Sequence, residues 1–592
     1  MNAERVKTRY IAPIDGLRAI AVFAVLLYHL GINWVPGGFL GVDLFFVISG
    51  YVITRLILDS IEQSSALDLR EFYRARMRRL LPAALGLIVS TTVISAIWAP
   101  EAMRSFLSDI PYALTGTINW RLVAKHQDYF EAIGRPPLLQ HMWSLAVEAQ
   151  FYLIWPLILI LILKFMGKKN IAPVALAIAS ISGIALFIFS LRVDSASTQK
   201  ISHIYFGTDT HSLGLFLGAA LAVSWIPQNL SSQISKRAQD VVDGIGVLGL
   251  FGLLSTFLFI SESNPTLYKL AFPLAGIFGC LVITSIVHPA SRFAPIMSSP
   301  VLLWVGQRSY GIYLWHWVIF QVTRPSVDLA GSAVAVNLAR ILLVLALADI
   351  SLRWIELPWR RGAIQNWFRG MKYRRKVVQR RQRGFVVGAL VTLMAITSTT
   401  AALGIHRADL AIQKNAPSQD SSVDYSAFPS PSNQASSGPA GLWVTGDSVI
   451  LGIRAKLESH SHIALINARV GRQIQELTTV VAADRAHVVG ATVILDLGNN
   501  NHLTEESVVT LFELLKDQPR IILVDTAVPR SWRDDNNRII RKVIKNYPQT
   551  TLIDWNSLSQ GHPEFFAPDG VHLSDAGSDV YVAAILDALQ KK

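Results

Sequence analysis

The sequence predicts two parts of different fold class: a polytopic α-helical membrane domain with about 11 transmembrane helices, then an extracytoplasmic α/β domain with a parallel sheet. The chain of 592 residues is 51% hydrophobic and 16% charged, which is too long for one domain and too apolar for an ordinary soluble protein. Long apolar stretches end near residue 405. Beyond residue 440, short apolar runs alternate with helix-length segments, a pattern typical of a parallel sheet with covering helices.

Apolar stretches of about twenty residues, the length that crosses roughly 30 Å of hydrocarbon, recur up to residue 405. The first is not a cleavable signal peptide, because it carries Asp15, Arg18 and His29. We expect spans over approximately 11–30, 40–58, 80–98, 143–164, 172–191, 210–226, 241–260, 268–287, 301–321, 334–354 and 384–405.

The basic residues predict the orientation of these spans. The formal net charge is +13, and clusters of Lys and Arg lie in short loops of the same parity, which favours membrane orientation over nucleic-acid binding. The loops are therefore expected in the cytoplasm, with the N-terminus inside and the C-terminus outside. The clusters are Arg70, Arg74, Arg76, Arg78 and Arg79 after the second span, Lys164, Lys168 and Lys169 after the fourth, and ten Lys or Arg between Arg360 and Arg383.

Four segments follow from this organisation. We expect a membrane domain at 1–360, a basic cytoplasmic loop with an additional transmembrane helix at 361–405, a Ser- and Pro-rich linker at 406–440, and the α/β domain at 441–592. The only cysteine is Cys280, which excludes an intrachain disulfide. The α/β domain must then be held together by its own core.

Ionisable side chains inside the spans are candidates for function, because they are costly in hydrocarbon. Arg18 and His29 are eleven residues apart, about three helical turns, so they share one face roughly 16 Å apart along the axis. Asp15 lies close to that face. Further candidates by position are Asp43, Glu148, Asp209, His211 and His316, all expected in the outer half of the membrane. Paired charges that only hold helices together are the alternative for each of them.

The two faces of the membrane suggest a division of labour. Arginine forks suit phosphates, and an acyl-CoA carries several, so the inner arginines are candidates for binding it. Histidine near the outer face suits proton transfer at a sugar hydroxyl. The acyl arm would then pass between the two.

The α/β domain contains the parts of a serine-dependent acyl-transfer site. Ser448 follows an apolar run and begins a helix, and APDGVHLS supplies Asp569 and His572 three residues apart. A serine nucleophile needs a base, and the base needs an orienting carboxylate. The backbone at Ser448 and Gly471 and the side chain of Asn500 are the candidate oxyanion donors.

Two family resemblances cover most of the chain. The first 360 residues resemble the acyltransferase family 3 membrane proteins, through Arg18-x10-His29, GVDLFFVISGYV at 41–52, FYRARMRRLLP at 72–82, HMWSLAVEAQFY at 141–152, SYGIYLWHW at 309–317 and ELPWR at 356–360. The resemblance implies that Arg18 and His29 are required and that Arg76 and Arg79 contact the coenzyme donor. At His211 relatives often have an arginine, so its role does not carry over.

Residues 440–590 resemble the SGNH hydrolase family, through GDS, a glycine, GxN and DxxH in that order. This implies Ser448, Asp569 and His572 as the triad. The fusion resembles bacterial O-acetyltransferases of the cell envelope. PRSW at 529–532, Asn536 or Asn537, and LIDW at 552–555 look closest to those acting on peptidoglycan muramoyl residues.

The resulting prediction is a plasma-membrane O-acetyltransferase of a bacterium, with acetyl-CoA as donor, an envelope glycan as acceptor and the lipid bilayer as surroundings. O-antigen, lipopolysaccharide or exopolysaccharide is the alternative acceptor. A transporter with an appended SGNH esterase and a glycan-binding anchor without chemistry are the alternatives of other classes. No metal is predicted, since the histidines lack ligand spacing, and no nucleic-acid partner. The sequence is compatible with a homo-oligomer but does not determine the oligomeric state.

Overall fold

The computed structural model divides the chain into two compact units. The membrane unit comprises Met1–Phe130, Pro137–Thr323 and Ser332–Ile405, and the C-terminal unit comprises Glu131–Pro136, Arg324–Gly331 and His406–Lys592. The structure describes residues 10–32, 34–64, 66–125, 135–191, 198–261, 267–325, 328–329, 332–371, 373–414, 441–460, 463–469, 472, 474–500, 503–530, 532–567 and 570–591.

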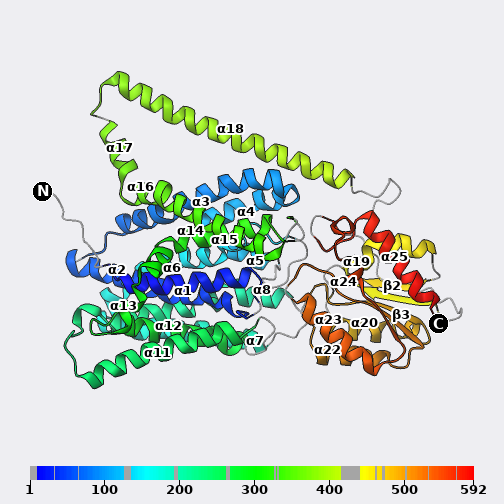
Figure 1. Cartoon of the computed structure of the whole chain (residues 1–592). Coiled ribbons are helices and arrows are strands. Elements are labelled where there is room, and N and C mark those ends of the chain that lie inside the picture. The colour runs from blue at the N-terminus through cyan, green and yellow to red at the C-terminus, as the bar shows by residue number, and fades with distance from the viewer. Residues whose placement is uncertain are drawn as a thin grey trace. The chain divides into compact units, whose positions relative to one another are not determined.

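The membrane unit is helical, and several of its long helices, among them α1, α6, α11 and α12, run alongside one another (Figure 1). Short 3-10 turns precede some helices, and a π-helical turn at Ser351–Glu356 joins α15 to α16. The helices are α1 (Ala12–His29), α2 (Gly41–Ser64), α3 (Leu69–Trp98), α4 (Met103–Thr115), α5 (Ile118–Ala124), α6 (Met142–Phe165), α7 (Ile171–Leu191), α8 (Thr198–Phe206), α9 (Thr208–His211), α10 (Leu213–Ser224), α11 (Lys236–Phe259), α12 (Phe272–Ile286), α13 (Phe293–Met297), α14 (Pro300–Val322), α15 (Ala333–Ile350), α16 (Leu357–Arg360), α17 (Ala363–Met371) and α18 (Lys376–Lys414).

Nine helical segments among the described residues are long and apolar enough to cross a membrane, fewer than the predicted 11. The other two predicted spans are α10 and α14. The α10 helix has only 12 residues, because Ser212 separates it from α9. The α14 helix has 23 residues but carries polar side chains such as Gln307, Arg308 and His316. Both form helices where apolar stretches were expected.

The last predicted span, 384–405, lies within a longer helix. The α18 helix begins at Lys376 and ends at Lys414. Basic residues from Lys376 to Arg383, expected in a loop, therefore belong to this helix, and the helix enters the segment predicted as linker. The rest of that linker, 415–440, lies outside the described residues.

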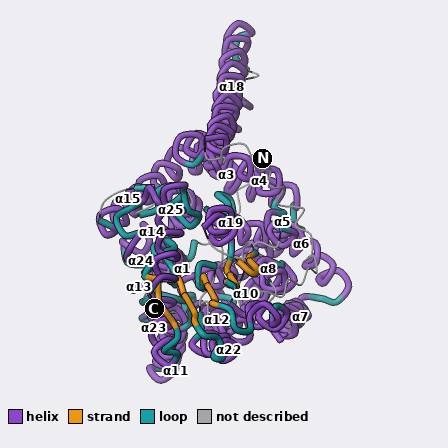
Figure 2. The backbone as a smooth tube through the Cα atoms, turned by 90° about the vertical axis from the view of Figure 1, so that its right-hand side faces the viewer, coloured by secondary structure: helices purple, strands orange, loops and turns teal. Residues whose placement is uncertain are grey.

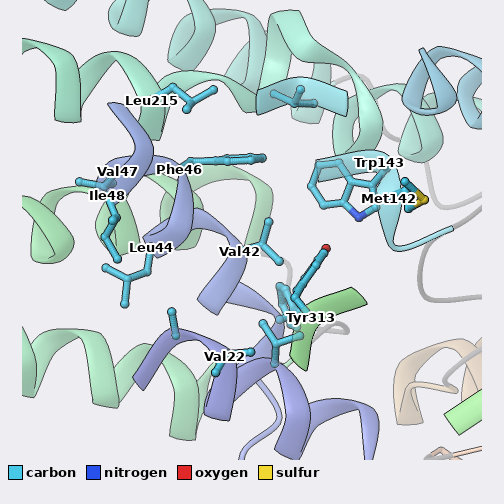
Figure 3. Close-up of a cluster of buried hydrophobic side chains, with 14 of the residues drawn as sticks. Val22, Val42, Leu44, Phe46, Val47, Ile48, Met142, Trp143, Leu215 and Tyr313 are labelled. Atoms are coloured by element: carbon cyan, nitrogen blue, oxygen red, sulfur yellow. The ribbon is translucent and has the colours of Figure 1, made fainter. Parts of the chain in front are cut away.

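The core of the membrane unit is built around α2. Side chains of α1, α2, α6, α10 and α14 meet there and are almost fully buried (Figure 3). Tyr313 of α14 lies among them, with its hydroxyl directed toward the start of α6 (Figure 3). The core therefore places α14 against α1, α2 and the N-terminal turn of α6.

Glycine allows α14 to approach α1 closely. An ideal Cβ on Gly306 would lie 1.8 Å from the carbonyl oxygen of Asp15, so only glycine fits. Farther along the same two helices, His316 contacts His29. The order of these two contacts shows that α1 and α14 run in the same direction, which aligns the polar residues of the two helices.

The C-terminal unit contains one five-stranded parallel sheet in the order β2-β1-β3-β4-β5, and all five strands belong to it (Figure 2). The predicted apolar runs correspond to four of these strands. The elements are β1 (Leu442–Gly446), α19 (Ser448–His460), β2 (Ile463–Ala468), α20 (Ile474–Ala483), α21 (Arg485–Val488), β3 (Thr492–Asp496), α22 (Glu505–Leu515), β4 (Arg520–Val524), α23 (Arg533–Val543), β5 (Thr550–Ile553), α24 (Trp555–Leu558) and α25 (Asp575–Gln590).

Helices cover both faces of this sheet. One hydrophobic cluster joins the sheet to α20, α22 and α23, and a second joins it to α19 and α25. Both clusters are formed entirely by residues between 442 and 589. The C-terminal domain thus has its own core, as the absence of a second cysteine requires. The edge strand β2 was missed by the sequence analysis, which assigned its residues to an amphipathic stretch.

Candidate active site

The membrane unit encloses a cavity of about 630 Å³. Four helical segments contribute arginines to it: α1, α2, α3 and α16 with the residue that follows it. Arg18, which the family resemblance implies is required together with His29, therefore lines the same cavity as Arg76 and Arg79, which are implied to contact the coenzyme donor. The polar lining is Tyr10, Asp15, Arg18, Ser49, Tyr51, Arg55, Asp59, Arg76, Arg79, Ser144, Glu148, Tyr152, Gln228, Gln307, Ser309, Tyr310, Tyr313, Arg360 and Arg361.

Arg18 is held in place by its neighbour one turn earlier. The Arg18 Nη1 donates to Asp15 Oδ1 at 3.0 Å, and the Tyr10 hydroxyl donates to Asp15 Oδ2 at 2.7 Å. Both carboxylate oxygens are thereby used. Because Asp15 sits where α14 passes α1, this pair fixes the guanidinium at the cavity wall. The structure thus assigns Asp15 a positioning contact.

The α3 arginines separate into two groups by helical face. Arg74 and Arg78 form ion pairs with Glu71. Arg76 and Arg79 line the cavity and form no ion pair with another described residue, and Arg76 Nε is buried without a hydrogen-bond partner there. The helix itself starts at Asp68, whose side chain accepts the Glu71 amide as an N-cap. Uncompensated guanidinium groups in a cavity favour a ligand with several negative charges.

Glu148 is the carboxylate facing this arginine cluster. It accepts hydrogen bonds from Ser49 Oγ at 2.6 Å and from the Tyr152 hydroxyl at 3.0 Å. The charges of Arg79 and Arg18 also act on it. Glu148 thus lines the same cavity as Arg76 and Arg79, although the sequence placed it in the outer half and these arginines on the inner side, and its two hydroxyl partners fix its carboxylate.

His29 does not line the cavity but lies behind Tyr313. Tyr313 closes one part of the wall, where Ser144 Oγ lies 2.7 Å from its hydroxyl and this hydroxyl donates to the His141 carbonyl oxygen at 2.8 Å. The Tyr313 ring is 5.4 Å from the His316 ring. His316 Nε2 lies 3.2 Å from His29 Nδ1. The two predicted histidines therefore meet one another directly.

Asp43 forms a separate polar pair. His211 Nε2 lies 3.0 Å from Asp43 Oδ1, and both residues are buried. Phe46, Trp143, Tyr205 and Phe272 surround the His211 ring at 4.6–5.8 Å. Neither residue lines the cavity, and the structure brings these two of the predicted polar candidates together. Asp209 pairs with His203 instead.

Several cavity residues were not individual candidates in the sequence analysis, among them Ser144, Tyr313 and Arg360. Each falls within a motif already noted, HMWSLAVEAQFY, SYGIYLWHW and ELPWR. Arg360 reaches the cavity through the π-helical turn Ser351–Glu356, and such turns occur often at functional sites. Their positions within these motifs could have identified them as candidates. The spacing alone does not tell which way each side chain points.

Ser448 occupies the predicted turn in the C-terminal domain. It is the first residue of α19, directly after β1 and Asp447, and it is buried. Among the described residues, its Oγ has no hydrogen-bond partner. The hydroxyl sits at the carboxyl end of the parallel sheet, between β1 and β3, where the strand order reverses. Ligands of open α/β sheets bind at such a point.

Asn500 lies next to this turn, after β3. Its Nδ2 donates to Asp447 Oδ2 at 2.5 Å and to the Arg472 carbonyl oxygen at 3.3 Å. Asp447 Oδ1 accepts the Val449 amide at 2.8 Å. Burial is the main cause that raises the pKa of Asp447 above its ordinary value. An amide donor is thus hydrogen-bonded to the residue directly before the serine, and an amide is a group that can stabilise an oxyanion.

The remaining predicted members of this site are only partly described. The His572 carbonyl oxygen accepts the Ala567 amide at 2.7 Å, next to the bridge between Phe566 and Leu573, and the charge of His572 acts on Asp447, the residue before Ser448. Asp569 and Gly471 lie outside the described residues. In the described part of the chain, no cluster of three or more His, Cys, Asp or Glu suited to a metal ion is found.

Comparison with known proteins decides the family. The family model described as an acyltransferase domain matches residues 11–352. The chain belongs to acyltransferase family 3. Full-length relatives of this family 3 acyltransferase include the peptidoglycan O-acetyltransferase OatA of Listeria monocytogenes, 32% identical over 99% of this chain and 99% of that protein. The O-acetyltransferase OatA of Staphylococcus aureus is 33% identical over 98% and 96% of the two chains.

The homology of this family 3 acyltransferase to O-acetyltransferases therefore includes the C-terminal domain. A putative O-acetyltransferase of Staphylococcus aureus is 34% identical over 99% of this chain and 98% of that protein. A solved lipase/acylhydrolase from Enterococcus faecalis aligns with 25% of this chain and 95% of its own length, at 16% identity and a TM-score of 0.21. The fold of the C-terminal domain rests on its own parallel sheet.

Proposed function

We propose that the protein transfers acetyl groups from cytoplasmic acetyl-CoA to peptidoglycan on the outer side of the membrane. The observation that carries the proposal is the cavity in which Arg76 and Arg79, without ion-pair partners among the described residues, face the same space as Arg18. Acetyl-CoA brings several phosphate charges, and arginine forks bind phosphate. The Listeria monocytogenes relative is a peptidoglycan O-acetyltransferase, which supports acetyl as the transferred group and peptidoglycan as the acceptor.

The orientation follows from the basic residues. Positively charged loops stay in the cytoplasm, which puts the start of α3 inside. Arg18 near the start of α1 then faces the cytoplasmic half, and His29 at its end lies roughly 16 Å farther out. The donor phosphates bind at the inner end of the cavity, and the acetyl group points toward Tyr313 and the histidines.

The transfer within the membrane unit needs a base near the thioester. His29 takes the proton of the hydroxyl of an alcohol carrier, a diffusible molecule distinct from the glycan, as that oxygen attacks the acetyl carbonyl, and the coenzyme leaves as the thiolate, which receives the proton. Arg18, fixed by Asp15, lies roughly 16 Å from His29 along α1 and therefore binds the donor phosphates rather than the reacting carbonyl. The donor side thereby ends as coenzyme A, and the acetyl group has moved to an oxygen ester.

The C-terminal domain completes the transfer through Ser448. The Ser448 Oγ attacks the acetyl ester while His572, oriented by Asp569, takes its proton and returns it to the leaving oxygen. A muramoyl hydroxyl then attacks the acetyl-serine, giving its proton to His572, and Ser448 is regenerated. Asn500 and the Gly471 amide donate to the oxyanion in both steps.

The test is the acetyl content of the cell wall. A strain without peptidoglycan O-acetylation receives the wild-type chain, His29→Gln, Ser448→Ala, or one of two controls, and base-released acetate is measured per muramic acid. The controls are His203→Gln, an exposed ion-pair histidine, and Ser557→Ala, an exposed serine of α24. Both active-site variants are expected at background and both controls at wild-type levels. Wild-type acetylation in Ser448→Ala would refute the role of the C-terminal domain.

A further inference from the structure

His316 makes two contacts that determine where its proton lies. Its Nδ1 is 2.6 Å from the Tyr313 carbonyl oxygen and 3.2 Å from that of Ile312. A carbonyl oxygen only accepts, so the Nδ1 of His316 carries the hydrogen. A neutral imidazole has one N–H group. The Nε2 of His316 is therefore an acceptor.

The tautomer of His316 determines that of His29, because the two rings are hydrogen-bonded to each other. The His316 Nε2 lone pair lies 3.2 Å from His29 Nδ1, so His29 Nδ1 must be the donor. His29 also hydrogen-bonds the carbonyl oxygen of Val25, one turn earlier in α1, and a carbonyl again requires a donor on the ring. Both neighbours thus demand an N–H on His29, and the contact with His316 places it on Nδ1.

We infer that His316 is a positioning residue that fixes His29 in its Nδ1–H tautomer and so keeps the lone pair on Nε2. The inference rests on the proposed function, in which His29 acts as the base. The opposite tautomer would present an N–H to the acceptor hydroxyl and would leave no nitrogen there to take its proton. The main-chain carbonyl of Tyr313 is the origin of this arrangement, since main-chain atoms do not titrate.

The packing keeps this pair in place. The His316 side chain is fully buried, with the Phe320 ring at 5.8 Å and the His141 ring at 6.0 Å. The Trp317 ring lies 5.1 Å from that of His29, and its Nε1 donates to the Pro137 carbonyl oxygen at 2.9 Å. Rings on both sides therefore restrict rotation of the two imidazoles. In known histidine sites, the partner of the second ring nitrogen selects the tautomer in the same way.

Two substitutions separate positioning from other roles of His316. In His316→Gln, the side-chain oxygen can accept from His29 Nδ1 at the place of the lost Nε2, but the amide cannot relay a proton. In His316→Leu, the volume is kept and the acceptor is lost. We expect His316→Gln to retain acetyl transfer within about tenfold of wild type. We expect His316→Leu to lower the rate of acetyl transfer roughly 10²- to 10⁴-fold, the range typical when a histidine loses the partner that orients its ring.

The assay uses the full chain in lipid nanodiscs with acetyl-CoA and soluble peptidoglycan fragments, and includes His29→Gln and the His203→Gln control. Equal loss in His316→Gln and His316→Leu would overturn the inference and indicate a proton relay or a structural role. If His29→Gln keeps full activity, the proposed function fails, which is a different outcome from failure of the positioning role.

A direct measurement covers the case in which His316→Leu does not fold. Solid-state NMR of the wild-type chain with ¹⁵N-labelled histidine distinguishes protonated from unprotonated ring nitrogens, and His29→Gln assigns the signals. The expected result is a protonated Nδ1 and an unprotonated Nε2 on His29. A protonated Nε2 on neutral His29 would contradict the inference, whatever the variants do.

Discussion

The Asn500 side-chain amide donates a 2.5 Å hydrogen bond to Oδ2 of Asp447, the residue directly before Ser448. The bond joins the loop after β3 to the turn after β1 across the point where the strand order reverses. The Asn500 amide is thereby bonded to the residue adjacent to Ser448, with no other side chain between them. In the proposed mechanism, the same Asn500 amide group leaves the Asp447 carboxylate and donates to the oxyanion instead.

Asn500→Ala should lower acyl transfer by roughly 10²- to 10³-fold through kcat, the loss typical for one oxyanion donor. The C-terminal domain, 441–592, with a chromogenic acetyl ester is sufficient for this measurement, because it has its own core. The matched control is Asn499→Ala. Asn499 donates to Asp496 Oδ1 at 2.8 Å and also hydrogen-bonds the Asp447 carboxyl, but it is not the proposed oxyanion donor, so its loss should reduce stability and lower kcat less than Asn500→Ala. If the two variants lost kcat equally, the assignment of the donor would be wrong.

Arg76→Gln and Arg79→Gln should each raise the KM for acetyl-CoA by about 10- to 100-fold, since a charge-assisted hydrogen bond contributes about 1.5–3 kcal/mol. The control is Arg74→Gln on the same helix, which removes only a surface ion pair with Glu71 and should leave KM unchanged. Steady-state kinetics in nanodiscs check this. A similar KM for all three variants would exclude the cavity as the donor site.

Gly306→Ala should destabilise the membrane unit, because the added Cβ would collide with the Asp15 carbonyl oxygen. Overpacking typically costs about 1–3 kcal/mol, and the shift of α14 should also displace Arg18 and reduce transfer. Gly244→Ala is the control, since a Cβ there meets nothing within 4 Å. Thermal unfolding in detergent is the measurement, and an unchanged midpoint in Gly306→Ala would contradict the close packing of α1 and α14.

Asp525 should make the C-terminal domain less stable as the pH rises from about 4 to about 6. Burial, opposed by the Asn556 amide and Arg541, raises the pKa of this carboxyl to about 6. The folded state then holds the proton more tightly than the unfolded state, so its stabilisation is complete below about pH 4 and is lost through pH 6. The difference amounts to about 3 kcal/mol at 1.36 kcal/mol per pKa unit.

Denaturant unfolding of residues 441–592 at pH 4, 5, 6 and 7 measures this effect. Asp525→Asn cannot titrate, so its unfolding free energy should fall less over this range than that of the wild type. Asp496 also has a pKa well above its ordinary value, mainly through burial and the charge of Asp447 and in smaller part through the charge of Asp525, so it contributes a pH dependence of the same sign to both proteins. Identical slopes in the two proteins would show that Asp525 titrates normally.

Local spacing predicted the contacts that lie within one helix. Arg18 and Asp15, three residues apart, form the expected pair, and the SGNH-like order of motifs located Ser448 and Asn500 at one edge of the sheet. Helical spacing also contained a signal that was not used. Arg76 and Arg79 share one face of α3, whereas Arg74 and Arg78 share another with Glu71.

Contacts between distant helices were not predictable in the same way. His29 and His316 are 287 residues apart, and their contact depends on the packing of α14 against α1, which the hydropathy pattern does not specify. Asp43 and His211 are 168 residues apart, and their contact likewise could not be read from their positions in two separate spans. The edge strand β2 was missed although it contains the apolar run IALI at 463–466, because so short a run does not by itself distinguish a strand from part of a helix.

The central claim is that an acetyl group from the cytoplasm reaches Ser448 through the membrane unit. Inverted membrane vesicles expose the cytoplasmic face, so labelled acetyl-CoA added outside them reaches only that face. After acid quenching and proteolysis, mass spectrometry measures label on the peptide that contains Ser448. Label is predicted in the wild-type chain and not in His29→Gln or Ser448→Ala. Equal label on the Ser448 peptide of the wild type and of His29→Gln would contradict the account.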